Sequence, residues 1–133
     1  MKAISECDAT HAIKLYSDFS VSGGYQAIGD LLKVRRDIDG VVCSDDAIAL
    51  GALRAIADAG LQVPEDIRVI GYDNIEMSRY SVPRLSTVNQ LPENIGDMVL
   101  DMFEQSVKAG SKPQKNVIEP HLVIRDTSQA RSA

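Results

Sequence analysis

The stretch from Asp39 to Asn74, DGVVCSDDAIALGALRAIADAGLQVPEDIRVIGYDN, predicts the fold of this chain. It opens with an unbroken apolar run, 40–43, which is typical of a strand covered on both faces. An amphipathic segment follows, and Gly60 stands where the C′ residue of a helix would lie. After Pro64 the apolar residues Ile67, Val69 and Ile70 predict another strand. Two parallel strands joined by a helix form a right-handed β-α-β unit. We therefore expect an α/β fold with an open parallel sheet and helices on both faces.

The helix of this unit carries its own start signals. Ser44 is a good N-cap, and the acids Asp45 and Asp46 favour the positive end of a helix. Helical spacing predicts the inward positions to be Ala47, Leu50, Leu53 and Ala57.

Three acids follow the predicted strands directly. Asp45 and Asp46 come after the first strand, and Asp73 comes after the second. The carboxyl ends of parallel strands share one edge of the sheet, and open α/β sheets bind ligands at that edge. The β-α-β unit therefore predicts a binding site as well as a fold.

Several segments resemble the lactose/galactose repressor (LacI/GalR) family of transcription regulators. The resemblance covers nearly the whole chain, in order. It is carried by SDDAIALGALRAIADAGLQVPEDIRVIGYDN at 44–74, YSDFS at 16–20 with SGGY at 22–25, RY at 79–80 with Pro83 and LSTVNQ at 85–90, and HLVIRDTS at 121–128. The family joins a helix-turn-helix to an effector domain built like a periplasmic sugar-binding protein. The likeness implies that this chain is the carboxyl-terminal half of such an effector domain, truncated from a longer protein.

The resemblance implies roles for particular residues. Phe19 matches an aromatic residue that stacks on the effector ring, although a loop anchor folded on the core is the alternative from pattern alone. Asp73 matches a ligand-binding acid, against the alternative that it caps a short helix at Ile75. Asn74 beside it is a further candidate. Gln90 lies where the family's chain crosses between subdomains, which suggests a hinge more than a ligand contact.

The Asp45–Asp46 turn departs from the family pattern. The family has Asn-Asp here, and the Asn contacts effector in several members. Asp45 replaces that amide with a carboxylate, which only accepts hydrogen bonds. The change indicates a ligand that offers donors at this point, or no contact there. Asp46 matches the pattern, and its main role could be that of a cap.

The remaining elements are expected as follows. We predict helices at 2–10, 23–34 (inward Ala27, Ile28, Leu31 and Leu32) and 92–109, strands at 12–16 and 85–88, a short helix or turn at 75–80, and an extended segment at 117–124. The organisation that follows is a main subdomain at 1–91, a helix at 92–110 that packs on the other subdomain in the family, return strands at 111–128, and a disordered tail at 129–133.

Composition narrows the function. The hydrophobic fraction is 44%, the charged fraction 25%, and the formal net charge −5, so no basic surface for DNA is expected in this chain. No apolar run has membrane length, and no Cys/His spacing indicates a metal. Ser22 and Ser44 have no His at triad spacing, so we expect no enzyme and no cofactor. We expect a cytoplasmic protein.

The sequence thus predicts the effector-sensing and dimerisation part of a transcriptional repressor, with a sugar or a purine as effector. The alternative is a fragment of a periplasmic sugar-binding protein of a transporter. Expected partners are the effector, a second copy of the chain, and DNA through a helix-turn-helix outside this sequence. Because the family's ligand lies between two subdomains, we expect weak effector binding or none. We also expect self-association, through the apolar stripe of the helix at 92–109 or through the family's dimer surface, which includes the helix after Asp46 and the 77–80 region.

Overall fold

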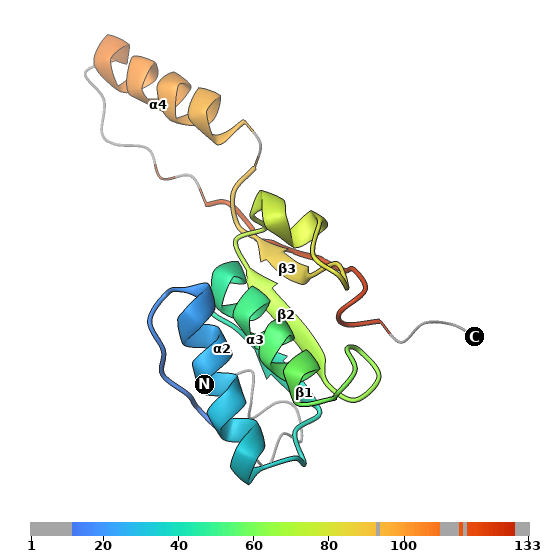
Figure 1. Ribbon diagram of the computed structural model, residues 1–133. Coiled ribbons are helices and arrows are strands. Elements are labelled where there is room, and N and C mark those ends of the chain that lie inside the picture. Colours follow the sequence, from blue (N-terminus) through green and yellow to red (C-terminus); the bar gives the residue numbers. More distant parts are fainter. Residues whose placement is uncertain (1–11, 93, 110–114, 116, 130–133) are drawn as a thin grey trace.

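The computed structural model describes residues 12–92, 94–109, 115 and 117–129 (Figure 1). Its elements in chain order are α2 (Val21–Val34), β1 (Gly40–Val42), α3 (Asp46–Asp58), β2 (Arg68–Tyr72), the 3₁₀ helix η1 (Glu76–Arg79), β3 (Ser86–Asn89), α4 (Ile95–Ala109) and β4 (His121–Val123).

The four strands form one open sheet in the order β1-β2-β3-β4. Strands β1, β2 and β3 are parallel, with Val41 opposite Val69 and Gly71 opposite Thr87. Strand β4 returns antiparallel to β3. The predicted α/β fold with an open sheet is confirmed, and its last strand makes the sheet mixed.

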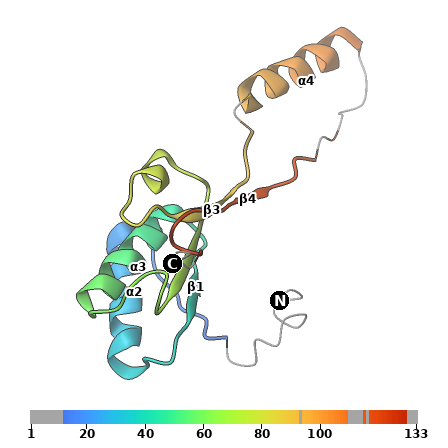
Figure 2. The ribbon, with the colours of Figure 1, turned by 90° about the vertical axis from the view of Figure 1, so that its right-hand side faces the viewer.

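Helices α2 and α3 run side by side on one face of the sheet (Figures 1 and 2). Helix α3 packs against α2 on one side and against β2 on the other. A Cβ atom on Gly24 would overlap the backbone of Ile48, and one on Gly51 would overlap the carbonyl of Val21. Glycine at these two positions therefore lets the helix backbones come close. The described residues place no helix on the opposite face.

Because α3 is covered from two sides, its buried surface is wider than the predicted stripe. Ala57 is exposed, and Ala47 and Leu50 are half-buried. The residues that fill the core from this helix are Ala49, Ala52, Leu53, Ala55 and Ile56. Ile28 and Leu32 of α2 are buried as predicted, whereas Ala27 and Leu31 are half-buried.

Two predictions at the amino-terminal end have different outcomes. The helix at 2–10 lies outside the described residues. Residues 12–16 form no strand, and all five are exposed. A strand needs a neighbour that satisfies its backbone N–H and C=O groups. No strand of the described sheet pairs with this segment, so its short apolar run remains irregular.

Helix α4 projects from the body, at the far end of β3 and before the return to β4 (Figures 1 and 2). It begins at Ile95 rather than at Pro92, because Pro92 stays outside the helix and its carbonyl accepts from the Ile95 N–H at 3.1 Å. It ends at Ala109, as predicted. The short helix at 75–80, the strand at 85–88 and the extended segment at 117–124 correspond to η1, β3 and β4. Of the predicted tail, Gln129 is described and exposed, and residues 130–133 lie outside the described part.

Candidate functional site

The carboxyl ends of the parallel strands and the amino-terminal ends of α2 and α3 lie at the same edge of the molecule (Figure 1). Loops from four places in the sequence therefore meet there. They carry Phe19 before α2, Asp45 before α3, Asp73 after β2 and Gln90 after β3. This edge is where the sequence predicted a binding site.

Asp45 is the N-cap of α3. Its Oδ1 accepts from the backbone N–H of Ala47 at 2.6 Å and of Ile48 at 3.2 Å. The predicted N-cap, Ser44, is wrong by one residue. The carboxylate of Asp45 satisfies two of the free N–H groups at the helix start, and the helix dipole stabilises its charge. The Asp45 side chain also lies within hydrogen-bonding reach of the Asp73 carboxyl.

Asp46 points into the protein and is fully buried. The hydroxyl of Thr87 donates to its Oδ1 at 2.6 Å, and the Ile75 N–H donates to its Oδ2 at 2.9 Å. Gly71 makes this possible, since a Cβ there would overlap Oδ1. Burial raises the pKa of Asp46, and the two hydrogen bonds oppose that rise. The interpretation of Asp46 as a cap is wrong, because this side chain joins α3 to β3 and to the turn after β2. Both of its oxygens are occupied within the protein.

Asp73 and Asn74 form a turn with positive φ, 103° and 55°. The Asp73 N–H donates to the Val88 carbonyl at 2.9 Å, and Gln90 Nε2 donates to Asp73 Oδ1. Burial raises the pKa of the Asp73 carboxyl, and the nearby charge of Asp45 raises it further. The cap of η1 is Ile75, without a side-chain bond, so the alternative role of Asp73 as a helix cap is wrong. The structure brings Asp45, Asp73 and Gln90 together.

Asn74 faces a different way. Its Oδ1 accepts from Arg125 Nη2 at 2.7 Å, and its N–H donates to Thr87 Oγ1 at 3.2 Å. Its amide oxygen is thus engaged by the protein. Phe19 is 77% exposed, so it is not a loop anchor folded on the core. An exposed aromatic side chain beside a polar edge is suited to stacking on a ligand ring.

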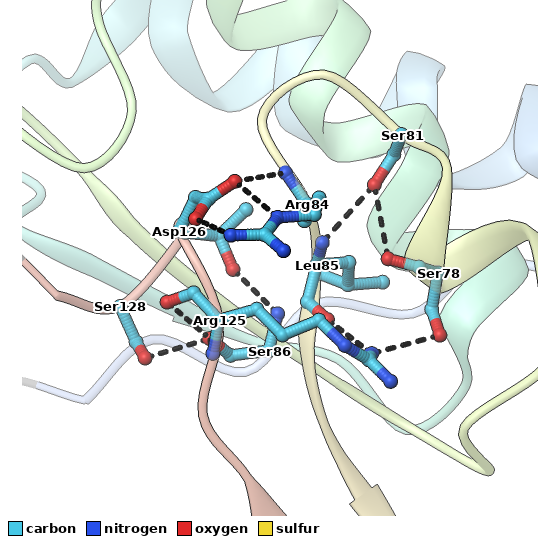
Figure 3. A network of polar contacts seen from close by, with 9 residues as sticks. Ser78, Ser81, Arg84, Leu85, Ser86, Arg125, Asp126 and Ser128 are labelled. Carbon is cyan, nitrogen blue, oxygen red and sulfur yellow. Dashed lines mark hydrogen bonds and ion pairs between the residues drawn. The ribbon is translucent and has the colours of Figure 1, made fainter.

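Sequence reasoning gave no role to Arg125, which lies just after β4. Its guanidinium contacts Ser78 on η1 and the carbonyl of Leu85 at the start of β3 (Figure 3). Its backbone N–H donates to Ser86 Oγ at 2.7 Å. The signal was present in the closing motif LVIRDTS at 122–128, but no pattern in the sequence indicates which segments the arginine would join.

The chemistry of this edge is that of hydrogen-bond acceptors. Asp45 and Asp73 offer carboxylate oxygens, and the Gln90 amide has its N–H₂ directed at Asp73. Such a surface suits a neutral ligand with O–H or N–H donors and disfavours phosphates. In the described part of the chain, no three His, Cys, Asp or Glu side chains are grouped for a metal, and no helix there could cross a membrane.

The chain matches the family of periplasmic binding protein-like domains over residues 3–128. The HTH-type transcriptional repressor PurR of Glaesserella parasuis serovar 5 is 39% identical over 118 residues, which are 84% of this chain and 35% of that protein. The PurR of Yersinia enterocolitica serotype O:8 is 35% identical over 128 residues, 94% of this chain and 38% of that protein. The chain therefore spans about a third of the length of the curated relatives it matches.

Solved structures of transcriptional regulators have a similar fold. A LacI family transcriptional regulator from Enterococcus faecalis V583 with bound ribose superposes with a TM-score of 0.77 at 30% identity, over 90% of this chain and 45% of that one. The complex of the transcriptional regulator CelR with cellobiose has a TM-score of 0.79 at 29% identity, over 96% of this chain and 40% of that one.

Proposed function

Because the chain belongs to the periplasmic binding protein-like domain family, we propose that it is the effector-sensing and dimerisation part of a cytoplasmic transcriptional repressor. The relatives named PurR, and the regulators solved with ribose and cellobiose, support a regulator over the alternative of a transport-binding protein. The regulators solved with ribose and cellobiose support a small neutral effector, and we propose a sugar or a purine. DNA binding would belong to a helix-turn-helix outside this sequence.

One observation carries the proposal. The carboxylate of Asp73 is held beside Asp45 by Gln90, at the edge of the sheet where α/β folds bind ligands. Each carboxylate can accept hydrogen bonds from ligand hydroxyl or ring N–H groups, which contribute about 1.5–3 kcal/mol each. Phe19 would cover one face of the ligand ring.

The roles of the candidate residues differ. We assign direct contacts to Phe19, Asp45 and Asp73. Gln90 acts both as a partner of Asp73 and as the first residue of the connection to α4, which fits a hinge that senses the ligand. We assign to Asn74 and Asp46 the role of stabilising the Asp73–Asn74 turn, because their oxygens are bound within the protein.

Regulation would follow from closure of the two subdomains of the effector domain around the ligand. Helix α4 follows β3 in the chain and precedes β4, and it projects beyond the site (Figure 2). Effector binding that moves the α4 side of the molecule against the sheet would shift a homodimer between two arrangements and change its affinity for operator DNA. The exposed Met77, Tyr80 and Val82 offer an apolar surface for that dimer. Helix α3 adds little to this surface, since its exposed residues are Arg54, Ala57 and Asp58.

Mapping by NMR tests this function. We would titrate the ¹⁵N-labelled chain with D-ribose, cellobiose and hypoxanthine, and follow amide shifts at ligand concentrations high enough for weak binding. The expected result is that one class of ligand shifts residues at the edge, around Phe19, Asp73 and Gln90. Shifts confined to the opposite end of the sheet would contradict it.

A further inference from the structure

Asp73 and Asn74 both have positive φ, a backbone conformation that residues other than glycine rarely adopt. Positive φ at two successive residues costs free energy, so surrounding contacts must hold it. Three backbone N–H groups of the turn are bound, those of Asp73, Asn74 and Ile75. The side chain of Asn74 is bound as well, through Arg125.

From these contacts we propose that Arg125 is a positioning residue, which fixes the Asp73–Asn74 turn and thereby the direction of the Asp73 carboxylate. Its Nη2 donates to Asn74 Oδ1 at 2.7 Å. Its Nη1 donates to Leu85 O at 2.7 Å and to Ser78 Oγ at 3.0 Å. One guanidinium thus joins the turn, the 3₁₀ helix that follows it and the start of the neighbouring strand.

The residues that bind Arg125 are themselves held by further hydrogen bonds. Ser78 accepts from Arg125 and donates its own hydroxyl to the Ile75 carbonyl at 2.6 Å. The backbone of Arg125 is fixed in turn by Ser86 Oγ, which also lies 2.7 Å from Ser128 Oγ (Figure 3). Both the guanidinium and the main chain of Arg125 are therefore held, so a small displacement of β4 would also displace the turn.

Lysine could not replace this arginine. Its ammonium is a single point, whereas the guanidinium is a planar fork whose two terminal nitrogens point at separate acceptors. Arg84 lies nearby and provides a matched comparison. It donates to Asp126 through Nε and Nη2, both at 2.9 Å, and makes no hydrogen bond to the turn.

The benefit to ligand binding rests on the proposed function, but the positioning itself does not. It is tested in the absence of ligand, by following the Asp73 carboxyl carbon by NMR as a function of pH. In the wild-type chain the Asp73 pKa is raised above its ordinary value of 3.8 by burial and by Asp45. Arg125→Lys keeps the positive charge and removes the fork. The expected result is a fall of the Asp73 pKa toward 3.8 and about tenfold faster hydrogen exchange at the Asn74 amide.

Two comparisons make the test specific. Arg84→Lys should leave the Asp73 pKa unchanged. Asn74→Gly tolerates positive φ and removes the acceptor, so Arg125→Lys should cause no additional change in that background. Unaltered amide shifts at Val69 and Ile56 would verify that the core is intact. An Asp73 pKa that is the same in Arg125→Lys and wild type, or that moves equally in Arg84→Lys, would overturn the positioning role. Neither result depends on whether ribose or hypoxanthine binds.

Discussion

At the scale of residues, the adjacent acids Asp45 and Asp46 have different structural roles. Asp45 caps α3, and its side chain lies close to that of Asp73. Asp46 faces inward, and each of its oxygens accepts one hydrogen bond from a different segment. A buried acceptor pair of this kind is costly to disturb, because each donor would be left unsatisfied.

Replacing Asp46 by Asn should therefore destabilise the fold. An amide has one acceptor atom, so with its oxygen on the Ile75 N–H its N–H₂ would face the Thr87 hydroxyl, which would then lose the acceptor for its own hydrogen. We expect Asp46→Asn to lower the free energy of unfolding by about 1–3 kcal/mol in urea denaturation at pH 7. The control is Asp58→Asn on the same helix, an exposed partner of Arg54, which should change stability by less than about 1 kcal/mol. Equal stability of Asp46→Asn and wild type would contradict the role of Asp46.

The raised pKa of Asp73 predicts a pH dependence. The folded state favours the protonated form, so the contribution of Asp73 to stability is fully present below the ordinary pKa of 3.8 and is lost as pH rises through the raised folded pKa. The stability of wild type relative to Asp73→Asn should therefore decrease as pH rises from 3.8 toward neutrality. Unfolding curves of both proteins across this range check it, and a difference that grows with pH would be the wrong sign.

The sequence predicted where these residues lie, but not which way their side chains point. Acids that follow parallel strands must gather at one edge, so the meeting of Asp45 and Asp73 was predictable from topology. Which of two successive acids turns inward depends on Gly71 and Thr87, which lie far along the chain and leave no local pattern. Arg125 was missed for the same reason, since its acceptors come from Asn74, Ser78 and Leu85.

At the scale of elements, the contact between α2 and α3 depends on the absence of side chains at Gly24 and Gly51. Helix α3 contacts both α2 and the sheet, and its backbone lies directly against that of α2. The periodicity of the sequence predicted both helices, but it could not predict that α3 would be covered on two sides. Residues 12–16 failed as a strand because strand formation needs a partner that no local pattern specifies.

Gly51→Ala should force these helices apart. The added Cβ would overlap the Val21 carbonyl and lie 2.6 Å from the Tyr25 nitrogen. We expect a loss of about 1–3 kcal/mol in the free energy of unfolding, measured by urea denaturation. Gly29→Ala on α2 is the matched control. Its nearest neighbour would be Ala55 Cβ at 4.0 Å, so the better helix propensity of alanine should stabilise the protein by about 0.5–1 kcal/mol. Similar effects of both changes would argue against close backbone packing.

At the scale of the whole molecule, α4 presents apolar side chains with large exposed surfaces. They are Val99, Leu100, Phe103 and Val107, each more than half exposed. An apolar stripe of this extent recruits a partner. We expect the chain to self-associate at concentrations of about 100 µM, and Val99→Glu with Phe103→Glu to reduce that association. Sedimentation velocity measures both, with Tyr80→Glu separating association through η1 from association through α4. A wild-type chain that sediments as a monomer at all concentrations would contradict this prediction.

The central claim is that the edge formed by Phe19, Asp45, Asp73 and Gln90 binds a neutral, donor-rich effector. The most direct measurement is the affinity of the ligand found by NMR mapping for wild type, Asp73→Ala and the control Asp30→Asn, whose carboxylate pairs with Lys33 on the exposed surface of α2. We predict that Asp73→Ala weakens binding at least about tenfold, as expected when a charge-assisted hydrogen bond is lost, and that Asp30→Asn binds like wild type. Equal affinity of wild type and Asp73→Ala would contradict the claim.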